Sequence, residues 1–224
     1  MGNYFMHADN GLKMIPESEI DTSLNNFLVN CESSCESSVI ESEGASTSQQ
    51  EILDFDTVSI GSPDDVWTLE FDDSYSSTES GAGIVLISPK GNLFLFSFKL
   101  QFNNTNNTTE YESLLLGMKV AQQKGIKNLH AQGDAELIVC QIRNIYQTRS
   151  EKLRHYRNLV WDLIETFDAF DISVVSCEFN DRADSLAVSA TSLIPHKDFL
   201  GSTYVVELVF RPGVPDSIAH TKHS

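Results

Sequence analysis

The sequence predicts an α/β fold in which a mixed sheet of five strands is covered by helices, and three observations support this prediction. First, three segments between residues 66 and 102 either alternate apolar with polar residues or form short apolar runs, as consecutive strands do. Second, from residue 110 the apolar residues recur with the period of an amphipathic helix. Third, helical and strand-like segments then alternate as far as residue 193, which is typical of a sheet that continues through helical crossovers.

The first three expected strands form an antiparallel meander at 66–72, 81–87 and 93–102. Alternate residues of the first strand share one apolar face: Trp67, Leu69 and Phe71. The sequence SPKGN between the second and third strands contains Pro, Gly and Asn, which are typical of a hairpin turn. These three segments therefore predict the antiparallel half of the sheet.

The second half of the expected fold alternates helices with strands. A helix from Glu110 to a C-terminal cap at Gly125 has one apolar stripe: Tyr111, Leu114, Leu115, Met118 and Ala121. A short strand is expected at 126–133, and a short helix follows at 135–143. The longest helix is expected at 151–168, where the apolar stripe is Leu153, Tyr156, Val160, Leu163 and Phe167.

Two more elements complete the predicted domain, a fifth strand at 171–177 and a last helix at 181–193. Beyond them, apolar and polar residues alternate over 203–210. This segment is bounded by Gly201 and Pro212, which indicates an extra strand. The remainder of 194–224 is interpreted as a tail of linker or remnant polyprotein sequence.

Four carboxylates stand at the ends of expected elements. Asp72 ends the first strand, Glu110 lies between a polar loop and a helix, Asp134 follows a strand, and Asp184 opens the last helix. Acids so far apart in sequence suggest one metal site that folding assembles. Carboxylate oxygens are preferred ligands of Mg²⁺, and two such ions are standard equipment for phosphodiester cleavage.

Each acid also has an ordinary structural interpretation. Asp72 suits a turn at a strand end, Asp134 suits a helix N-cap, and Glu110 and Asp184 suit the first turn of a helix. Glu70 shares a strand face with Asp72, and a solvated face is the expected environment for it. Only the joint occurrence of the four acids with their flanking residues favours the metal site.

Four motifs contain these acids in order: WTLEFDDS, TNNTTEYESLL, GDAELIV and NDRADSLA. Together they resemble type 1 ribonuclease H, and most closely the RNase H-like domain in gypsy-class retrotransposon polyproteins of plants. The resemblance covers 66–193. It implies an RNase H-like fold with helices on both faces of the sheet. It also implies a retroelement-derived endoribonuclease that cleaves the RNA strand of RNA–DNA hybrids and belongs to a larger polyprotein.

The resemblance assigns the catalytic and metal-binding roles to Asp72, Glu110, Asp134 and Asp184. It implies two Mg²⁺ ions, with Mn²⁺ as a substitute. Asp72 would bridge both ions, Glu110 and Asp134 would hold one, and Asp184 would hold the other. Four close carboxylates repel one another without metal, so their pKa values are expected to be coupled.

Hybrid binding is expected at two places. The resemblance assigns contacts with the nucleic-acid backbone or base edges to the paired Asn106 and Asn107, although a helix-entry turn explains them almost as well. The one concentration of bases offers phosphate contacts: Arg143, Arg149, Lys152, Arg154 and Arg157. An ordinary solvated helix face is the alternative for these bases. Recognition of the hybrid would rest on 2′-hydroxyl groups.

Two departures from the family pattern keep other functions open. Asp73 stands where the family has Gly, and the loop at 176–182 lacks the His of the cellular enzymes, which predicts slower turnover. The alternative is a catalytically inactive RNase H-like module that binds nucleic acid or another protein. A 3′–5′ exonuclease is disfavoured, because 176–184 has no His or Tyr near the last acid.

The negative charge is concentrated in the N-terminal third. The net charge of the 224 residues is −17, and residues 1–66 carry −12 of it. This third is rich in Ser, Asn and Glu, so 1–65 is predicted to be a disordered leader to the domain at 66–193. A short helix at 17–29 is the alternative for part of it.

The same sequence favours an intracellular protein, nuclear or cytoplasmic, that makes no membrane contact. It has no secretory signal, and no apolar run approaches the roughly 20 residues that span a bilayer. The four cysteines, at 31, 35, 140 and 177, have no paired metal-binding spacing. Cys140 and Cys177 lie in apolar contexts and are expected to be plain core thiols.

Overall fold

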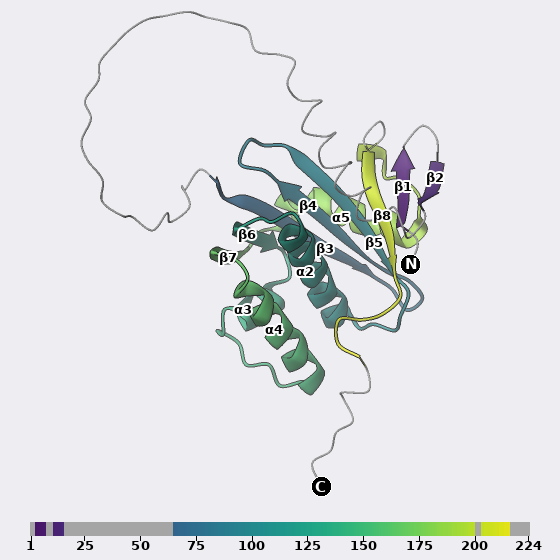
Figure 1. Cartoon of the computed structure of the whole chain (residues 1–224). Coiled ribbons are helices and arrows are strands. Elements are labelled where there is room, and N and C mark those ends of the chain that lie inside the picture. The colour runs from purple at the N-terminus through teal and green to yellow at the C-terminus, as the bar shows by residue number, and fades with distance from the viewer. Residues whose placement is uncertain (1–2, 8–10, 16–64, 200–202, 216–224) are drawn as a thin grey trace, which may run out of the picture.

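A computed structural model describes residues 3–7, 11–15, 65–199 and 203–215. In this part of the chain, one mixed sheet lies between helices (Figure 1). The strand order is β2-β1-β8-β5-β4-β3-β6-β7. The predicted α/β class, with helices on both faces of a mixed sheet, is confirmed. The alternative helix at 17–29 lies outside the described residues.

The centre of the sheet consists of the five strands that the sequence predicts. They are β3 (Trp67–Tyr75), β4 (Ser80–Ile87), β5 (Leu93–Leu100), β6 (Asn128–Gly133) and β7 (Ala169–Val174). β3, β4 and β5 pair antiparallel, whereas β6 is parallel to both β3 and β7. The meander and the parallel half therefore meet at β3.

The sheet has eight strands in the described residues, not five. β8 (Thr203–Val209) pairs parallel with β5, and it is the extra strand that the alternation indicated. β1 (Asn3–His7) pairs antiparallel with β8 and with β2 (Gly11–Ile15). These last two strands belong to the predicted disordered leader, and they extend the sheet on the side of β8 (Figure 1).

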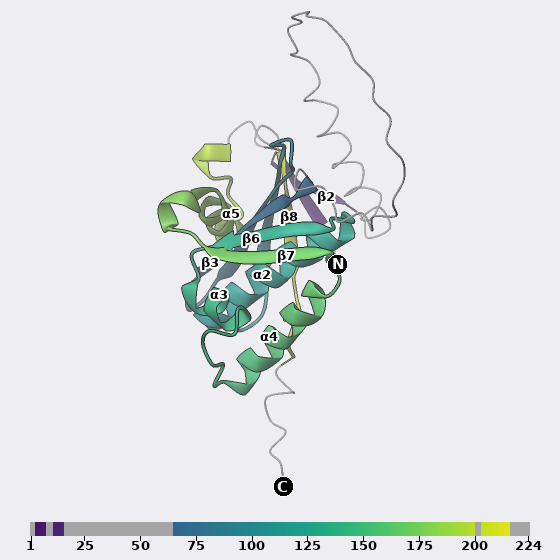
Figure 2. The same cartoon turned by 90° about the vertical axis from the view of Figure 1, so that its left-hand side faces the viewer.

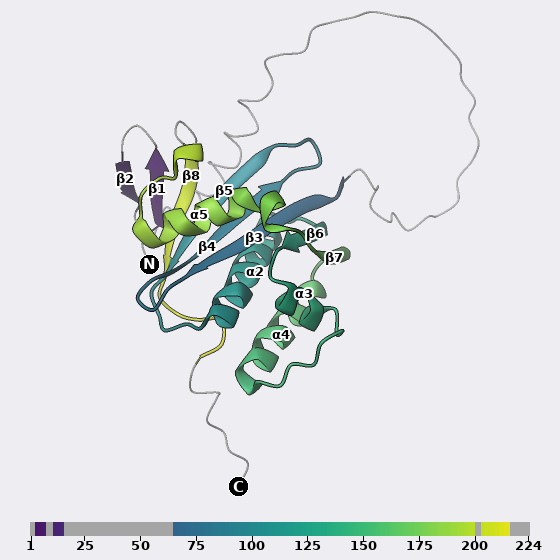
Figure 3. The same cartoon turned by 180° about the vertical axis from the view of Figure 1, so that it is seen from behind.

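The helices divide unequally between the two faces. α2 (Asn106–Gln123), α3 (Glu136–Ile142) and α4 (Glu151–Ile164) lie on one face, and α5 (Asp181–Ser192) crosses the other (Figures 2 and 3). The stripe predicted for α2 is fully buried in the larger core cluster. A smaller cluster lies on the α5 face: Val85, Leu95, Leu186, Phe199, Tyr204 and Val206. Among the described residues, no helix has both the length and the apolar character needed to cross a bilayer.

α2 begins four residues before Glu110, because Thr105 caps it. The Thr105 side chain accepts a hydrogen bond from the Thr108 N–H, and the Thr108 hydroxyl accepts one from the Thr105 N–H. This reciprocal cap satisfies backbone donors that the first turn leaves without partners. Glu110 consequently lies in the second turn of α2, not at its start.

Glu70 is buried, so the expectation of a solvated face was wrong. α5 covers this face of β3, and Glu70 is only 2% exposed. Arg182 donates two hydrogen bonds to it, from Nη2 at 2.5 Å and from Nε at 3.0 Å, and Gln132 donates a third, long one at 3.4 Å. A buried carboxylate needs such partners, and this pair fastens the start of α5 to β3.

The segment after β8 is part of the packed fold, so the interpretation of 194–224 as linker was wrong as far as residue 215. The Gly213 N–H donates to Glu112 Oε1 at 2.6 Å, and the Tyr156 hydroxyl donates to the same oxygen at 2.5 Å. Val214 is 2% exposed and belongs to the main core. The chain thus returns across α2 toward α4 before it leaves the described region.

A chain that begins at residue 66 is expected to melt cooperatively, because the two core clusters are built from residues 69–214. Removal of β1 leaves β8 as an edge strand with unpaired backbone groups, so self-association is expected to increase. Calorimetry and size-exclusion chromatography of the shortened and full chains test both expectations. Loss of the cooperative transition would show that the N-terminal segment is structural.

Candidate metal centre

One cavity of about 420 Å³ lies where β3, β6, α2 and the start of α5 meet. All four acids expected at a metal site line it, and Asn106 does too. Its lining is Asp72, Asp73, Tyr75, Asn106, Glu110, Asp134, Ala135, Cys177, Asp181 and Asp184. Among these described residues there are six carboxylic acids and no Lys, Arg or His, so the cavity favours a cation.

Each acid reaches the cavity from a different element. Asp72 lies in β3 opposite Gly83 of β4, and Asp134 directly follows β6. Asp184 lies in the first turn of α5. Glu110 projects from α2, where Asn106 Nδ2 donates a hydrogen bond of 2.9 Å to Glu110 Oε1. Strand pairing and helix packing, rather than local sequence, therefore bring the acids together.

Burial and mutual repulsion make four of the six acids in the cavity hard to ionise. Burial, and then the charge of Asp134, raise the pKa of Asp72 from 3.8 to about 7. Burial, and then the charge of Glu110, raise the pKa of Asp73 from 3.8 to about 8. The pKa values of Glu110 and Asp184 are also raised, again mainly by burial and next by Asp134. A bound cation would relieve this repulsion.

The residues fit a hard divalent cation, although their present positions do not yet form a ligand shell. No three carboxylate, imidazole or thiol groups among the described residues stand close enough to hold an ion as they are. The donors are nonetheless mostly carboxylate oxygens, as Mg²⁺ prefers. Glu110 Oε2 is buried without a hydrogen-bond partner. A cation would have to draw these side chains closer together.

Asn180, which sequence reasoning did not single out, joins two of the acids. It is completely buried. Its Nδ2 donates to the Phe71 carbonyl oxygen and to Asp72 Oδ2, both at 3.1 Å, and lies 3.5 Å from Asp134 Oδ1. Its own Oδ1 is buried without a partner. The position of Asn180 just before a helix is typical of an ordinary cap residue, so nothing local indicated this contact.

Cys177 is exposed in the cavity wall, so the expectation of a core thiol was wrong. The expected strand at 171–177 included it, but β7 ends at Val174 and Cys177 begins the 3₁₀ turn η3 (Cys177–Phe179). Its Sγ donates a hydrogen bond of 3.2 Å to Asp134 Oδ2. Cys140 is half-buried.

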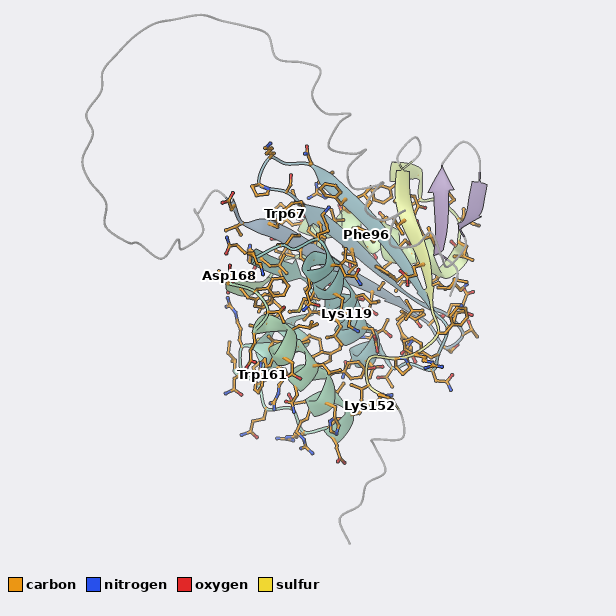
Figure 4. All side chains as sticks on the ribbon, in the orientation of Figure 1. Trp67, Phe96, Lys119, Lys152, Trp161 and Asp168 are labelled. Carbon is orange, nitrogen blue, oxygen red and sulfur yellow. The ribbon has the colours of Figure 1, made fainter. Side chains whose placement is uncertain are left out.

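The residues expected to bind the hybrid are not gathered at the cavity, apart from Asn106. Asn107 is half-buried and does not line it, and neither do the five bases of 143–157. Arg143 is ion-paired with Asp171 at 2.9 Å, and Arg157 stacks on Trp161 at 4.2 Å. Arg149 and Arg154 are exposed beside the N-terminus of α4, and Lys152 is half-buried in its first turn (Figure 4).

The metal-free protein is expected to lose stability as the pH rises from about 4 to about 8. The pKa values of Asp72 and Asp73 are higher in the folded chain than in the unfolded chain, so the folded state binds more protons in this range. The free energy of unfolding then falls with rising pH. Melting temperatures across this range, with and without Mg²⁺, test the prediction. Asp73→Asn should flatten the slope of melting temperature against pH. An unchanged slope in this variant would contradict the prediction.

Comparisons with known proteins agree with this fold. A family model described as reverse transcriptase-like matches residues 70–190. A protein of Halobacterium salinarum named Ribonuclease HI is 30% identical over 111 residues, which are 50% of this chain and 56% of that protein. The chain thus spans little more than half the length of this curated relative.

Solved structures show the same similarity. RNase H1 of Halobacterium salinarum superposes with a TM-score of 0.54 and 27% identity, over 56% of this chain and 96% of that one. A ribonuclease H1 isolated from compost, solved with an RNA/DNA hybrid, superposes with a TM-score of 0.51 and 22% identity, over 57% of this chain and 96% of that one. The N-terminal RNase H domain of a Mycobacterium tuberculosis protein superposes with a TM-score of 0.54 and 21% identity, over 58% of this chain and 96% of that one. The chain therefore has an RNase H-like fold and belongs to the reverse transcriptase-like family.

Proposed function

We propose that this chain is a metal-dependent endoribonuclease that cleaves the RNA strand of RNA–DNA hybrids. The observation that carries the proposal is the acidic cavity, in which four acids from four different elements meet within an RNase H-like fold. The relative named Ribonuclease HI supports it, and so does the compost ribonuclease, which was solved with an RNA/DNA hybrid.

Asp72, Glu110, Asp134 and Asp184 would hold Mg²⁺, with Mn²⁺ as a substitute. When bound, a pair of such ions stabilises the charge on the attacking and leaving oxygens of a phosphodiester. The protein's own contribution is to hold the ligands in place. Asn180 fixes Asp72 beside Asp134, and Asn106 orients Glu110.

Nucleic-acid contacts would come from two sides of the cavity. Asn106 lies at its rim beside Glu110 and is exposed, so its amide group is available for a base edge or a sugar. Asn107, Lys152 and the exposed Arg149 and Arg154 would contact more distant parts of the hybrid. The 2′-hydroxyl groups, which only RNA has, would distinguish the strand to be cut.

A retroelement origin fits the reverse transcriptase-like family match, and a plant gypsy-class polyprotein is the source we propose. One observation favours a second function, an inactive module that binds nucleic acid or protein. Asp73 adds a sixth acid to the cavity, and its carboxyl group takes up a proton near neutral pH. A cation that binds beside Asp73 must therefore displace a proton, which weakens metal binding near neutral pH.

A cleavage assay distinguishes the two functions. The full chain is incubated with Mg²⁺ or Mn²⁺ and a hybrid that is labelled on the RNA strand. We expect internal cuts in the RNA, no cuts in duplex DNA, and loss of activity in EDTA. Binding of the hybrid without cleavage under all metal conditions would replace the enzyme with the inactive module.

Arg154→Ala is expected to weaken hybrid binding equally for all sequences, because a phosphate contact carries no base information. The slope of log affinity against log salt should become shallower by about one contact. Fluorescence anisotropy at several salt concentrations measures both. Lys90→Ala, in the exposed turn between β4 and β5, removes the same charge and should leave the slope unchanged. Equal effects of the two variants would contradict a phosphate contact at Arg154.

A further inference from the structure

A second cavity, larger than the metal cavity, lies directly beside it. This cavity, the hairpin groove, has a volume of about 510 Å³. Two continuous segments line it: the end of β3 with the turn to β4 at 75–80, and the end of β5 with the following loop at 99–104. Tyr75 lines both the hairpin groove and the metal cavity, and it is 43% exposed. Tyr75 is therefore a wall that the two cavities share.

Hydrogen bonds hold both walls of the hairpin groove in place. In the turn, the Ser76 N–H donates to the Glu79 carbonyl oxygen at 2.8 Å, and the Glu79 N–H donates to Ser76 Oγ at 3.0 Å. Asn104 Nδ2 donates to Ser80 Oγ at 2.8 Å, which joins the loop after β5 to the start of β4. The groove is therefore formed before any ligand enters it.

The chemistry of the hairpin groove differs from that of the acidic metal cavity. Its two charged side chains, Lys99 and Glu79, lie 3.2 Å apart, so the lining carries no net charge. Lys99 Nζ also donates to the carbonyl oxygen of Thr191 at 2.6 Å. Four exposed lining side chains make no hydrogen bond with another described residue: Ser77, Thr78, Gln101 and Asn103. The groove thus offers uncharged donors and acceptors beside an exposed aromatic residue.

We propose that the hairpin groove binds an unpaired nucleotide of the RNA strand, with its base stacked on Tyr75. It rests on the proposed function, which places the strand to be cut in the adjacent metal cavity. Bases inside a duplex are covered by their neighbours, whereas unpaired bases stack on aromatic side chains and present their edges to hydrogen-bonding groups. The volume lies within the range of small-ligand pockets, about 300–1,000 Å³. The chain therefore prefers hybrids whose RNA strand continues, unpaired, beyond the duplex.

Hybrid binding by the full chain tests this preference in EDTA, which prevents metal-dependent cleavage. Fluorescence anisotropy compares a blunt RNA–DNA hybrid with the same hybrid carrying a single-stranded extension, on the RNA strand or on the DNA strand, at either end. An RNA extension at one end should raise the affinity by about tenfold, the usual size of one base–aromatic contact. A DNA extension should give no such gain. Because the groove carries no net charge, the gain should change little with salt.

Substitutions locate the gain in the hairpin groove. Tyr75→Ala and Asn103→Ala should each bring the ratio of the affinities for extended and blunt hybrids close to one, whereas Tyr75→Phe keeps the ring and should keep the ratio. Tyr146→Ala is the matched control, because Tyr146 is 44% exposed and lines neither cavity. This variant should also keep the ratio.

Three results would overturn the proposal: equal affinities for extended and blunt hybrids, no measurable binding of either, or a ratio that Tyr75→Ala leaves unchanged. Cleavage assays with Mg²⁺ separate this failure from a failure of the proposed function. A chain that shows the Tyr75-dependent gain but cleaves no hybrid would refute the proposed function alone. A chain that cleaves the hybrid without the gain would refute the role of the groove alone.

Discussion

Asp134→Asn is expected to abolish hybrid cleavage while leaving the fold intact. The amide keeps the shape of the side chain but loses the charge that would hold a cation at the centre of the cavity. The charge of Asp134 raises the pKa values of Asp72, Glu110 and Asp184, so this residue interacts with all three of the other acids. A loss of at least about a thousandfold in kcat is expected, comparable to the removal of a major electrostatic contribution to the transition state.

The stability of the same variant provides an independent check. Without metal, Asp134→Asn should melt at the same temperature as the natural chain or above it, because one of the repelling charges is gone. With Mg²⁺, the natural chain should be stabilised more than the variant, because a ligand of the folded state raises the melting temperature. Asp168→Asn, at an exposed turn before β7 (Figure 4), is the matched control and should change neither activity nor stability. Retained cleavage in Asp134→Asn would remove this residue from the metal site.

Gly83→Ala is expected to destabilise the protein strongly and to displace Asp184. A Cβ atom at Gly83 would lie 1.9 Å from the Ala183 carbonyl oxygen and 2.5 Å from the Ala187 backbone nitrogen. These are backbone atoms of α5, so no side-chain rotation relieves the overlap and the whole helix must move away from β4. Overpacking typically costs about 1–3 kcal/mol, and a clash with backbone should lie at or above the upper end of that range.

Gly91→Ala is the matched control for this substitution. Gly91 has a φ of +85° in the turn between β4 and β5, and a Cβ atom added there would have no neighbouring atom within 4 Å. The substitution should cost only about 1 kcal/mol, from the unfavourable backbone conformation. Chemical denaturation of both variants measures the difference, and activity should fall in Gly83→Ala alone. Equal losses of stability would show that α5 does not pack tightly on Gly83.

Between residues 66 and 210, the sequence by itself determined the local elements, because each one has its own period of apolar residues. The stripe that includes Tyr111 and Leu114 predicted α2, and the alternation around Leu69 predicted β3, since these patterns reflect burial on one face. The four motifs also predicted which acids to examine. The start of α2 was misplaced by four residues, because the reciprocal cap between Thr105 and Thr108 was not recognised.

Only the tertiary structure decided what lies beside these elements, because contacts between distant residues leave no periodic signal. The pairing of β1 with β8, the burial of Glu70 under α5 and the packing of Val214 on the core all depend on segments far apart in sequence. The same holds for the contacts that Asn180 and Cys177 make with Asp134, which lies more than forty residues earlier. A carboxylate, an amide and a thiol look ordinary in their local sequence, and it is the meeting of β3, β6 and the turn before α5 that places them around one cavity.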